Sequence, residues 1–260
     1  MVRSAIVTLP SLAPKHGEFN LSRDIQGLHL MEAIVLAGGF GTRLRELVPE
    51  LPKPMAPVAG RPFLEILLTS LAHKGFRRVV LSLGYMAETV AAHFGNQFLE
   101  IELVYEVENT PLGTGGAVRQ ALTRCNEDHV FVFNGDTYLD LEVADVEAHW
   151  QIHLLPIIVA REVPDTARYG RLVTSGGRVT GFLEKGMAGS GLINAGCYVL
   201  PVDILNGFAV GQPFSLEADF MAKTVNVMNI DVFVTKGHFI DIGVPADYML
   251  AQTELAGICR

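Results

Sequence analysis

The chain has 260 residues, three cysteines and a formal net charge of −8 at pH 7. The length suffices for a large core and favours one α/β domain, whereas the negative charge, without any basic run, argues against non-specific nucleic-acid binding. Three cysteines without metal-ligand spacing fit a reducing cytosol better than a disulfide scaffold, and no apolar run approaches the length of a membrane span. We therefore expect a cytoplasmic protein without nucleic-acid or membrane partners.

The first thirty residues show no helical or strand periodicity. They lack the apolar core of a signal peptide, because Pro10 interrupts the short run that precedes it. Met31 stands directly before the first predicted strand. We predict an N-terminal extension over 1–30 and a single domain over 31–260; a functional arm or an oligomer contact is the alternative for the extension.

Strand and helix patterns alternate after Met31. Strands are predicted at 33–36, 78–83, 101–106 and 130–133, with helices from 62, from 84 and from about 114. This alternation predicts a parallel sheet with right-handed crossovers.

The pattern changes after residue 140. Extended runs are predicted at 157–160, 171–174, 178–182, 191–199, 230–234 and 239–240. Gly176-Gly177 indicates a hairpin, Ser215 can cap a helix, and Pro245 can start the last one. We therefore predict an α/β fold with a Rossmann-like mixed, mostly parallel central sheet flanked by helices.

Glycines cluster in the turn after the first predicted strand, where residues 36–44 read Leu-Ala-Gly-Gly-Phe-Gly-Thr-Arg-Leu. Thr42 can cap the following helix, and backbone N–H groups in such a turn can approach a phosphate. Arg43 adds a guanidinium fork, and Lys53 is a cation held between two prolines. The turn is neither a Walker A loop nor a dinucleotide fingerprint. A tight turn without a ligand is the structural alternative.

This stretch, followed by Pro-Lys-Pro-Met at 52–55, resembles the signature of the sugar-1-phosphate nucleotidyltransferases. The resemblance extends from about Met31 to about Leu255. It implies a GT-A-like fold with a nucleotide-binding half at about 31–140 and a sugar-binding half at about 141–260. It also implies that Arg43 holds the departing phosphates and that Lys53 contacts the reacting ones. The residues expected around the nucleoside triphosphate are Leu36, Ala37, Gly38, Gly39, Gly41 and Thr42.

Two aspartates are candidate metal ligands. Asp136 follows the predicted strand at 130–133, where open α/β sheets bind ligands and a carboxylate suits Mg²⁺; a turn or helix cap is the alternative. The family resemblance implies that Asp136 and the distant Asp241 share the metal. A shared Mg²⁺ would relieve the repulsion between the two carboxylates. Asp247 is expected in the first turn of a helix.

A second glycine-rich turn reads Pro-Leu-Gly-Thr-Gly-Gly over 111–116. Its structural interpretation is a capped helix with close backbone packing. The resemblance implies a loop around the base, with backbone groups of Leu112 and Gly113, the adjoining Thr114, and the Glu108 carboxylate. The sequence of this turn is most similar to that of family members that use guanine nucleotides.

Positions in the second half match the family's sugar pocket. The implied sugar-phosphate residues are Tyr169, Gly170, Glu184, Lys185 and Asn194, with Glu217 nearby in the pattern. Side chains of this kind can bond sugar hydroxyls, and a glycine leaves room for the ring.

His149 and His153 lie four residues apart on a predicted helix, a spacing that can hold a metal. No third ligand is near them in the sequence, so we predict a solvated helix face instead.

The resemblance implies transfer of a nucleoside monophosphate to a sugar 1-phosphate, with Mg²⁺ as cofactor and pyrophosphate as product. The short length and the guanine-type turn most resemble the D-glycero-α-D-manno-heptose 1-phosphate guanylyltransferases, which make GDP-heptose for surface polysaccharides. Mannose-1-phosphate guanylyltransferase and N-acetylmuramate-1-phosphate uridylyltransferase are the alternatives. A non-catalytic relative that binds a nucleotide sugar and regulates a partner is an alternative of another class. A homo-oligomer is compatible with all of them.

Overall fold

The structure is a computed structural model, and it describes residues 30–39, 44 and 48–257. Four parallel strands form one half of the main sheet: β1 (Glu32–Leu36), β4 (Arg78–Leu83), β6 (Ile101–Val107) and β7 (His129–Asn134). All four were predicted, β6 from its alternating pattern and the others from apolar runs. The short β5 (Gln97–Phe98) pairs antiparallel with β6 and ends the sheet.

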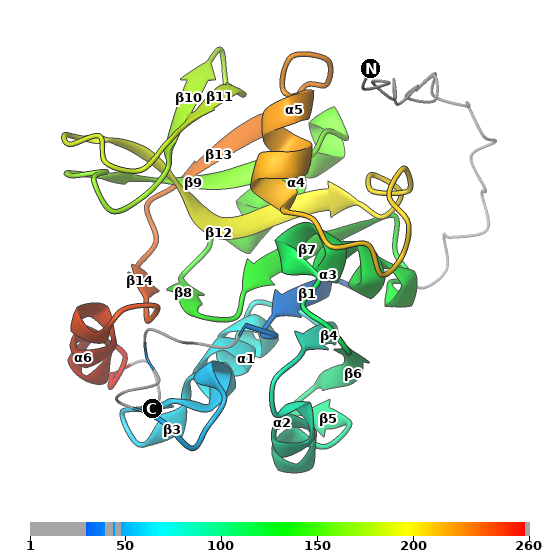
Figure 1. Cartoon of the computed structure of the whole chain (residues 1–260), viewed down its shortest axis with the longest axis vertical. Helices are drawn as coiled ribbons and strands as arrows, with labels where there is room; N and C mark the ends of the chain where they lie inside the picture. Colours follow the sequence, from blue (N-terminus) through cyan, green and yellow to red (C-terminus); the bar gives the residue numbers. More distant parts are fainter. Residues whose placement is uncertain (1–29, 40–43, 45–47, 258–260) are drawn as a thin grey trace, which may run out of the picture.

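The second half of the chain extends the same sheet. Its strands are β9 (Ile157–Val163), β10 (Arg171–Ser175), β11 (Arg178–Leu183), β12 (Gly191–Pro201) and β13 (Asp231–Thr235). The order across the sheet is β10-β11-β13-β9-β12-β7-β1-β4-β6-β5. Because β12 is antiparallel to both β7 and β9, and β13 is parallel to β9, strands β7, β9 and β13 run in the same direction. Figure 1 shows the predicted β10–β11 hairpin and the β5–β6 pair at opposite ends of the sheet. The predicted α/β fold with a mixed sheet is confirmed.

Helices cover both faces of the sheet. Residues of α1 (Phe63–His73), α2 (Ala87–Phe94) and α4 (Val143–His153) pack in one apolar cluster with strands of the sheet. The opposite face is covered by α3 (Gly113–Ala121), which continues as η3 (Leu122–Arg124), and by the π-helix η4 (Leu216–Met221) followed by α5 (Ala222–Thr224). The sheet is therefore the middle of three layers.

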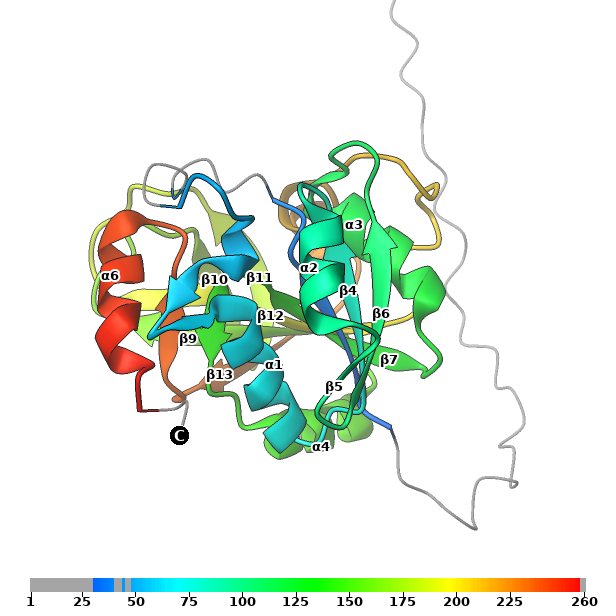
Figure 2. The same ribbon diagram turned by 90° about the horizontal axis from the view of Figure 1, so that it is seen from below.

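A third cluster lies beneath α6 (Pro245–Glu254) and includes residues of α1. Two small sheets lie beside this cluster and contribute side chains to it. They are β2 (Pro57–Val58) with β3 (Arg61–Pro62) and β8 (Thr137–Leu139) with β14 (Phe239–Asp241). Figure 2 shows α6 and α2 on opposite sides of α1. The strands β2, β3, β5 and β8 were not predicted, because two or three residues carry no measurable periodicity.

Two predicted details differ in the structure. Pro62 was expected as the first helical residue, but it ends β3 and stands at the N-cap position of α1. Ser215 does cap the following helix, because its Oγ accepts the N–H of Ala218, although that helix is of the π type. None of the helices in the described part of the chain has the length and apolarity required to span a bilayer.

Several predictions fall outside the described residues. These are the extension up to residue 29, the helix start at Arg43, and the positions of Gly41 and Thr42. The division into a nucleotide-binding half and a sugar-binding half stays a prediction.

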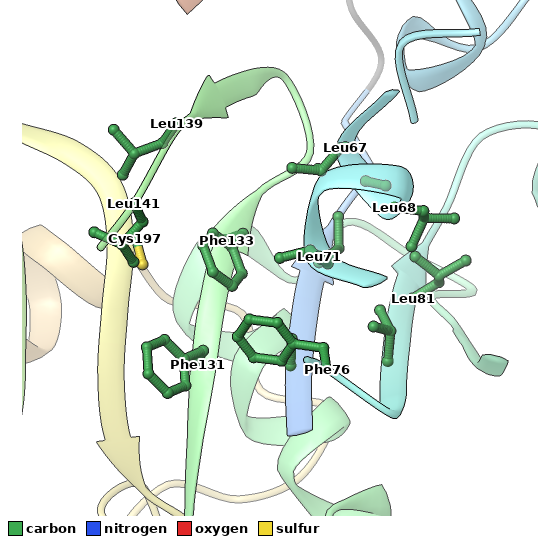
Figure 3. Packing of buried hydrophobic residues seen from close by; sticks show 14 of the residues in the cluster. Leu67, Leu68, Leu71, Phe76, Leu81, Phe131, Phe133, Leu139, Leu141 and Cys197 are labelled. Atoms are coloured by element: carbon green, nitrogen blue, oxygen red, sulfur yellow. The ribbon is translucent and has the colours of Figure 1, made fainter. Parts of the chain in front are cut away.

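Three aromatic rings anchor the largest cluster. Phe76 is fully buried, and its ring meets those of Phe131 and Phe133 edge to face at centroid distances of 5.3 and 5.8 Å. Figure 3 shows Phe76 between Leu71 of α1 and the two phenylalanines of β7. These ring contacts hold the loop that follows α1, and with it the helix, against the sheet.

We predict that Phe76→Ala lowers the free energy of unfolding by about 3–5 kcal/mol, because it removes a buried ring and leaves a cavity. Chemical denaturation monitored by circular dichroism measures the loss. Ile152→Ala, at a side chain that is 76% exposed, is the control and should change stability little. Equal losses in the two variants would contradict this account of the core.

Candidate active site

A cavity of about 350 Å³ opens at the carboxyl ends of β1, β4 and β7. Ligands of open α/β sheets bind at this edge, because the turns that follow the strands present backbone N–H groups there. The sequence-predicted residues that line it are Leu36, Ala37, Gly38, Gly39, Lys53, Glu108, Gly113, Thr114 and Asp136. Both predicted glycine turns therefore face one cavity.

Other residues that line the cavity were not predicted from the sequence. The further residues are Pro54, Ser82, Pro111, Ala117, Asn134 and Gly135. Asn134 and Ser82 lie at the ends of parallel strands, which is a signal that the sequence does carry. Leu112, predicted to contact the base, is not among the lining residues and is 4% exposed.

The first glycine turn is packed tightly on its neighbours. A Cβ atom added to Gly38 would lie 2.9 Å from Glu108 Oε1 and 3.3 Å from the backbone nitrogen of Gly84. One added to Gly135 would lie 2.6 Å from the carbonyl oxygen of Leu36. Gly39 differs, because among the described residues beyond its chain neighbours no atom lies within 4 Å of the position that its Cβ would take. Packing thus explains Gly38, whereas it gives no reason for a glycine at position 39.

The second glycine turn packs against Phe214, in the segment just before η4. Gly113 has a φ of +67°, and a Cβ at Gly115 would lie 2.2 Å from a ring carbon of Phe214. The N–H groups of Gly115 and Gly116 donate to the carbonyl oxygen of Phe214. These glycines are explained by close packing, which is the structural alternative that the sequence left open.

Glu108 links the second glycine turn to β4. Its Oε2 accepts the N–H of Leu112 at 2.9 Å, and its Oε1 faces Ser82 Oγ at 3.4 Å. Burial raises the pKa of this carboxyl group, and the two hydrogen bonds oppose the rise. The carboxylate therefore holds the walls of the cavity in place.

A cation and two carboxylates meet beside the cavity. Lys53 Nζ contacts Asp136 Oδ2 at 2.5 Å. Asp241 is brought next to them because β14 pairs with β8, so that it lies opposite Thr137, and the N–H of Ile242 donates to the carbonyl oxygen of Asp136. The two predicted metal ligands, distant in sequence, are thereby held side by side.

The charges at this site favour a further cation. Burial raises the pKa of the Asp241 carboxyl group, and the negative charge of Asp136 raises it further, although the N–H of Gly243 and the charge of Lys53 act in the opposite direction. Carboxylate oxygens are the ligands preferred by hard divalent ions, and such an ion would relieve the repulsion. The residues present therefore fit a divalent metal.

A chain of hydrogen bonds connects the predicted sugar side to the nucleotide turn. Thr114 Oγ1 donates to Glu217 Oε2 at 2.9 Å, and the Tyr198 hydroxyl donates to Glu217 Oε1 at 2.6 Å. Asn194 Nδ2 in turn donates to the Tyr198 hydroxyl at 2.6 Å. Burial and the neighbouring Glu217 raise the pKa of Tyr198, so this hydroxyl stays a donor. Tyr198 was not predicted as a site residue, because its apolar strand context carries no functional signal.

The other predicted sugar residues lie farther from the cavity. Tyr169 packs on Phe239 beside Asp241, with ring centroids 6.4 Å apart. Gly170, Glu184 and Lys185 are exposed, and none of them lines the cavity. These three stay predictions. Asp247, expected in a first helical turn, does lie there in α6 and also pairs with Arg168.

A solvated helix face was predicted for the two histidines of α4, and this prediction is wrong because a third potential ligand lies beside them. His149 and His153 both contact the buried carboxylate of Asp231, a third potential ligand that the sequence separates from them by 78 residues or more. Tertiary structure alone brings this residue to the helix.

Comparison with known proteins decides the family. The family described as "Nucleotidyl transferase" matches residues 32–257. The chain belongs to the nucleotidyl transferase family. It is therefore an enzyme of the nucleotidyltransferase class, EC 2.7.7 type.

Individual members of the family are similar over nearly their whole length. D-glycero-alpha-D-manno-heptose 1-phosphate guanylyltransferase of Aneurinibacillus thermoaerophilus is 39% identical over 226 residues, which cover 86% of this chain and 98% of that protein. The protein of the same name from Campylobacter jejuni is 37% identical over 219 residues, covering 84% and 97%. The crystal structure of HddC from Yersinia pseudotuberculosis complexed with GMP-PN is similar with a TM-score of 0.78 and 36% identity, covering 86% of this chain and 99% of that one.

Substitution of the two neighbouring glycines of this nucleotidyltransferase can distinguish a role in packing from a role in ligand binding. We predict that Gly38→Ala lowers the melting temperature without any ligand, because its methyl group would meet backbone atoms of the next turn. Gly39→Ala should leave the melting temperature of the free protein unchanged and weaken nucleotide binding. Differential scanning fluorimetry with and without nucleotide measures both effects. A reversed order of the two melting temperatures would refute this reading of the turn.

Proposed function

We propose that this nucleotidyltransferase transfers GMP from GTP to D-glycero-α-D-manno-heptose 1-phosphate and releases pyrophosphate, forming a GDP-heptose. The observation that carries the proposal is the placement of Lys53, Asp136 and Asp241 beside a cavity walled by both glycine turns. The choice of substrates is supported by relatives that bear the guanylyltransferase name and that this chain covers almost completely. A cytoplasmic location and a homo-oligomer stay predictions.

The reaction needs little proton transfer. A phosphate oxygen of the sugar 1-phosphate forms a bond to the α-phosphorus of GTP, and the bond from that phosphorus to the bridging oxygen of pyrophosphate breaks. The nucleophile is already an anion at neutral pH, so catalysis depends on positioning and on neutralising charge. The Lys53 ammonium is the described cation at the cavity suited to this task. We keep the predicted role of Arg43, which lies outside the described residues, as part of the proposal.

Asp136 and Asp241 would hold the divalent ion, which we propose to be Mg²⁺. When bound, it would neutralise phosphate charge as a Lewis acid. The Lys53 ammonium pairs with Asp136 and lines the cavity, so it would also reach the reacting phosphates.

The base and the sugar would occupy opposite sides of the reacting phosphates. On one side, the turn at Gly113 and Thr114, held by Glu108, would receive the base. On the other side, Asn194 would present its side chain to the sugar, because Tyr198 and Gly196 hold both ends of its amide. Thr114 and Asn194 share one hydrogen-bonded chain, so the two substrate sites are mechanically connected.

Pyrophosphate release with Mg²⁺ tests the proposal directly. GTP, ATP, CTP, UTP and dTTP are each combined with heptose-, mannose-, glucose- and N-acetylmuramate 1-phosphates. Turnover confined to GTP with the heptose phosphate is the expected result. Turnover with another pair would replace the substrates and keep the reaction class, whereas no turnover with any pair, from folded protein, would favour the regulatory alternative.

The metal assignment has its own test. We predict that Asp136→Asn lowers kcat by at least about 10²–10³-fold, because it removes one charged ligand at the reacting phosphates while keeping the side-chain shape. Asp140→Asn is the control: this nearby carboxylate is exposed and pairs with Lys74. Steady-state kinetics and circular dichroism measure activity and folding. Normal turnover of Asp136→Asn would exclude the assigned site.

The hydrogen-bonded chain predicts a selective defect. Tyr198→Phe should raise KM for the sugar phosphate, because Asn194 and Glu217 lose their shared partner, and should cost about 1–3 kcal/mol of stability. Tyr248→Phe loses a comparable bond, to the carbonyl oxygen of Pro57, outside the cavity. That control should lose stability without any change in KM. The same KM for both variants would argue against a role of Asn194 in sugar binding.

A further inference from the structure

Three potential metal ligands converge at the edge of the sheet opposite the cavity. His149 Nε2 lies 2.9 Å from Asp231 Oδ2, and His153 Nδ1 lies 2.5 Å from the same oxygen. The two imidazole nitrogens are 3.2 Å apart. In the part of the chain that the structure describes, this is the one group of three such residues whose ligand atoms meet.

The positions of these side chains follow from the fold. Residues four apart on a helix share a face, and the face of His149 and His153 adjoins the buried side of α4, which Val143, Val146 and Trp150 form. Asp231 begins β13, where its N–H donates to the carbonyl oxygen of Pro156. Because β13 is parallel to β7, its first residue lies at the sheet edge away from Asn134 and the cavity. The cluster is thus separate from the proposed catalytic site.

We propose that His149, His153 and Asp231 form a binding site for a divalent transition-metal ion of the Zn²⁺ class. Two imidazoles and one carboxylate are the ligand types of such ions, and histidines at i and i+4 of a helix are a known way to present them. Ligand bonds of about 2.0–2.2 Å imply ligand atoms about 3.3 Å apart in a tetrahedral site. The nitrogen–nitrogen distance of 3.2 Å already matches this value, and the carboxylate oxygen has to recede by several tenths of an ångström.

Burial adds a reason for a cation at this place. The Asp231 side chain is 4% exposed, and a buried carboxylate requires compensation of its charge. Arg178 Nε faces the other oxygen, Oδ1, at 3.7 Å, and half of the arginine side chain is exposed. Oδ2 is left to the two histidines alone among the described residues. His153 is 45% exposed, so an ion can enter from solvent and keep water at its remaining positions.

The ion would link two segments that also serve the catalytic site. α4 follows the segment that carries Asp136, and β13 leads into β14, which carries Asp241. Cross-linking the end of α4 to the start of β13 would stabilise the folded state, because the unfolded chain does not preform the site. A role in structural stability, independent of the substrates, is therefore the expected function.

Calorimetric titration of Zn²⁺ into the full chain tests the site, with excess Mg²⁺ present to occupy the aspartate pair. One Zn²⁺ per chain is expected to bind and to raise the melting temperature. His153→Gln should weaken binding at least about 100-fold, because even outer-sphere changes at metal sites cost 10–100-fold. Asp231→Asn should behave in the same way. His153→Gln is the decisive variant, because replacing an exposed side chain should leave the fold intact, so that weaker binding cannot be attributed to misfolding. Circular dichroism verifies the fold of this variant.

Two controls locate the ion. His73→Gln removes a helical histidine outside the cluster and should bind Zn²⁺ as the unaltered chain does. Asp241→Asn should also retain Zn²⁺ binding, which separates this site from the catalytic one. The proposal is overturned if the unaltered chain binds no Zn²⁺ under excess Mg²⁺, if His153→Gln binds it equally well, or if Asp241→Asn is the variant that loses it.

Discussion

The charge balance among Lys53, Asp136 and Asp241 is the constraint on which the rest of the site depends. Among the described residues, these two carboxylates and one ammonium group place an excess of negative charge where a polyanionic substrate is proposed to react. The fold maintains this arrangement through backbone bonds, since β8 and β14 pair and Ile242 bonds to Asp136. A divalent cation would relieve the repulsion between the two carboxylates, and their oxygens fit such an ion.

Close backbone packing supports that site from behind. Gly38 and Gly135 allow three strand ends to approach so closely that a methyl group at either position would meet a neighbouring main chain or carboxylate. The second glycine turn packs equally closely against Phe214, in the second half of the chain. Glu108 then connects the second turn to Ser82 of β4 through its carboxylate. The described part of the cavity wall is therefore held by close packing, which would lower the ordering cost of binding the proposed nucleotide.

The second half of the chain contributes polar connections that no local pattern reveals. Tyr198 and Glu217 carry hydrogen bonds from Asn194 to Thr114 across the sheet. The cluster of His149, His153 and Asp231 is assembled in the same way at the other edge, from a helix and a strand that are far apart in sequence. Both arrangements depend on β12 and β13 joining the sheet formed by the first half.

The sequence by itself determined the parallel strands, the helices between them and the two glycine turns, because periodicity and turn chemistry are local properties of the chain. It also carried the motif around Lys53 and Asp136 that indicated the family. Tertiary structure decided which glycines serve packing, since Gly115 is explained only by the ring of Phe214. It likewise decided that Asp231 stands beside His149 and His153, and that Glu184 and Lys185 lie outside the cavity. Contacts between residues distant in sequence depend on strand order and register, which local patterns do not encode.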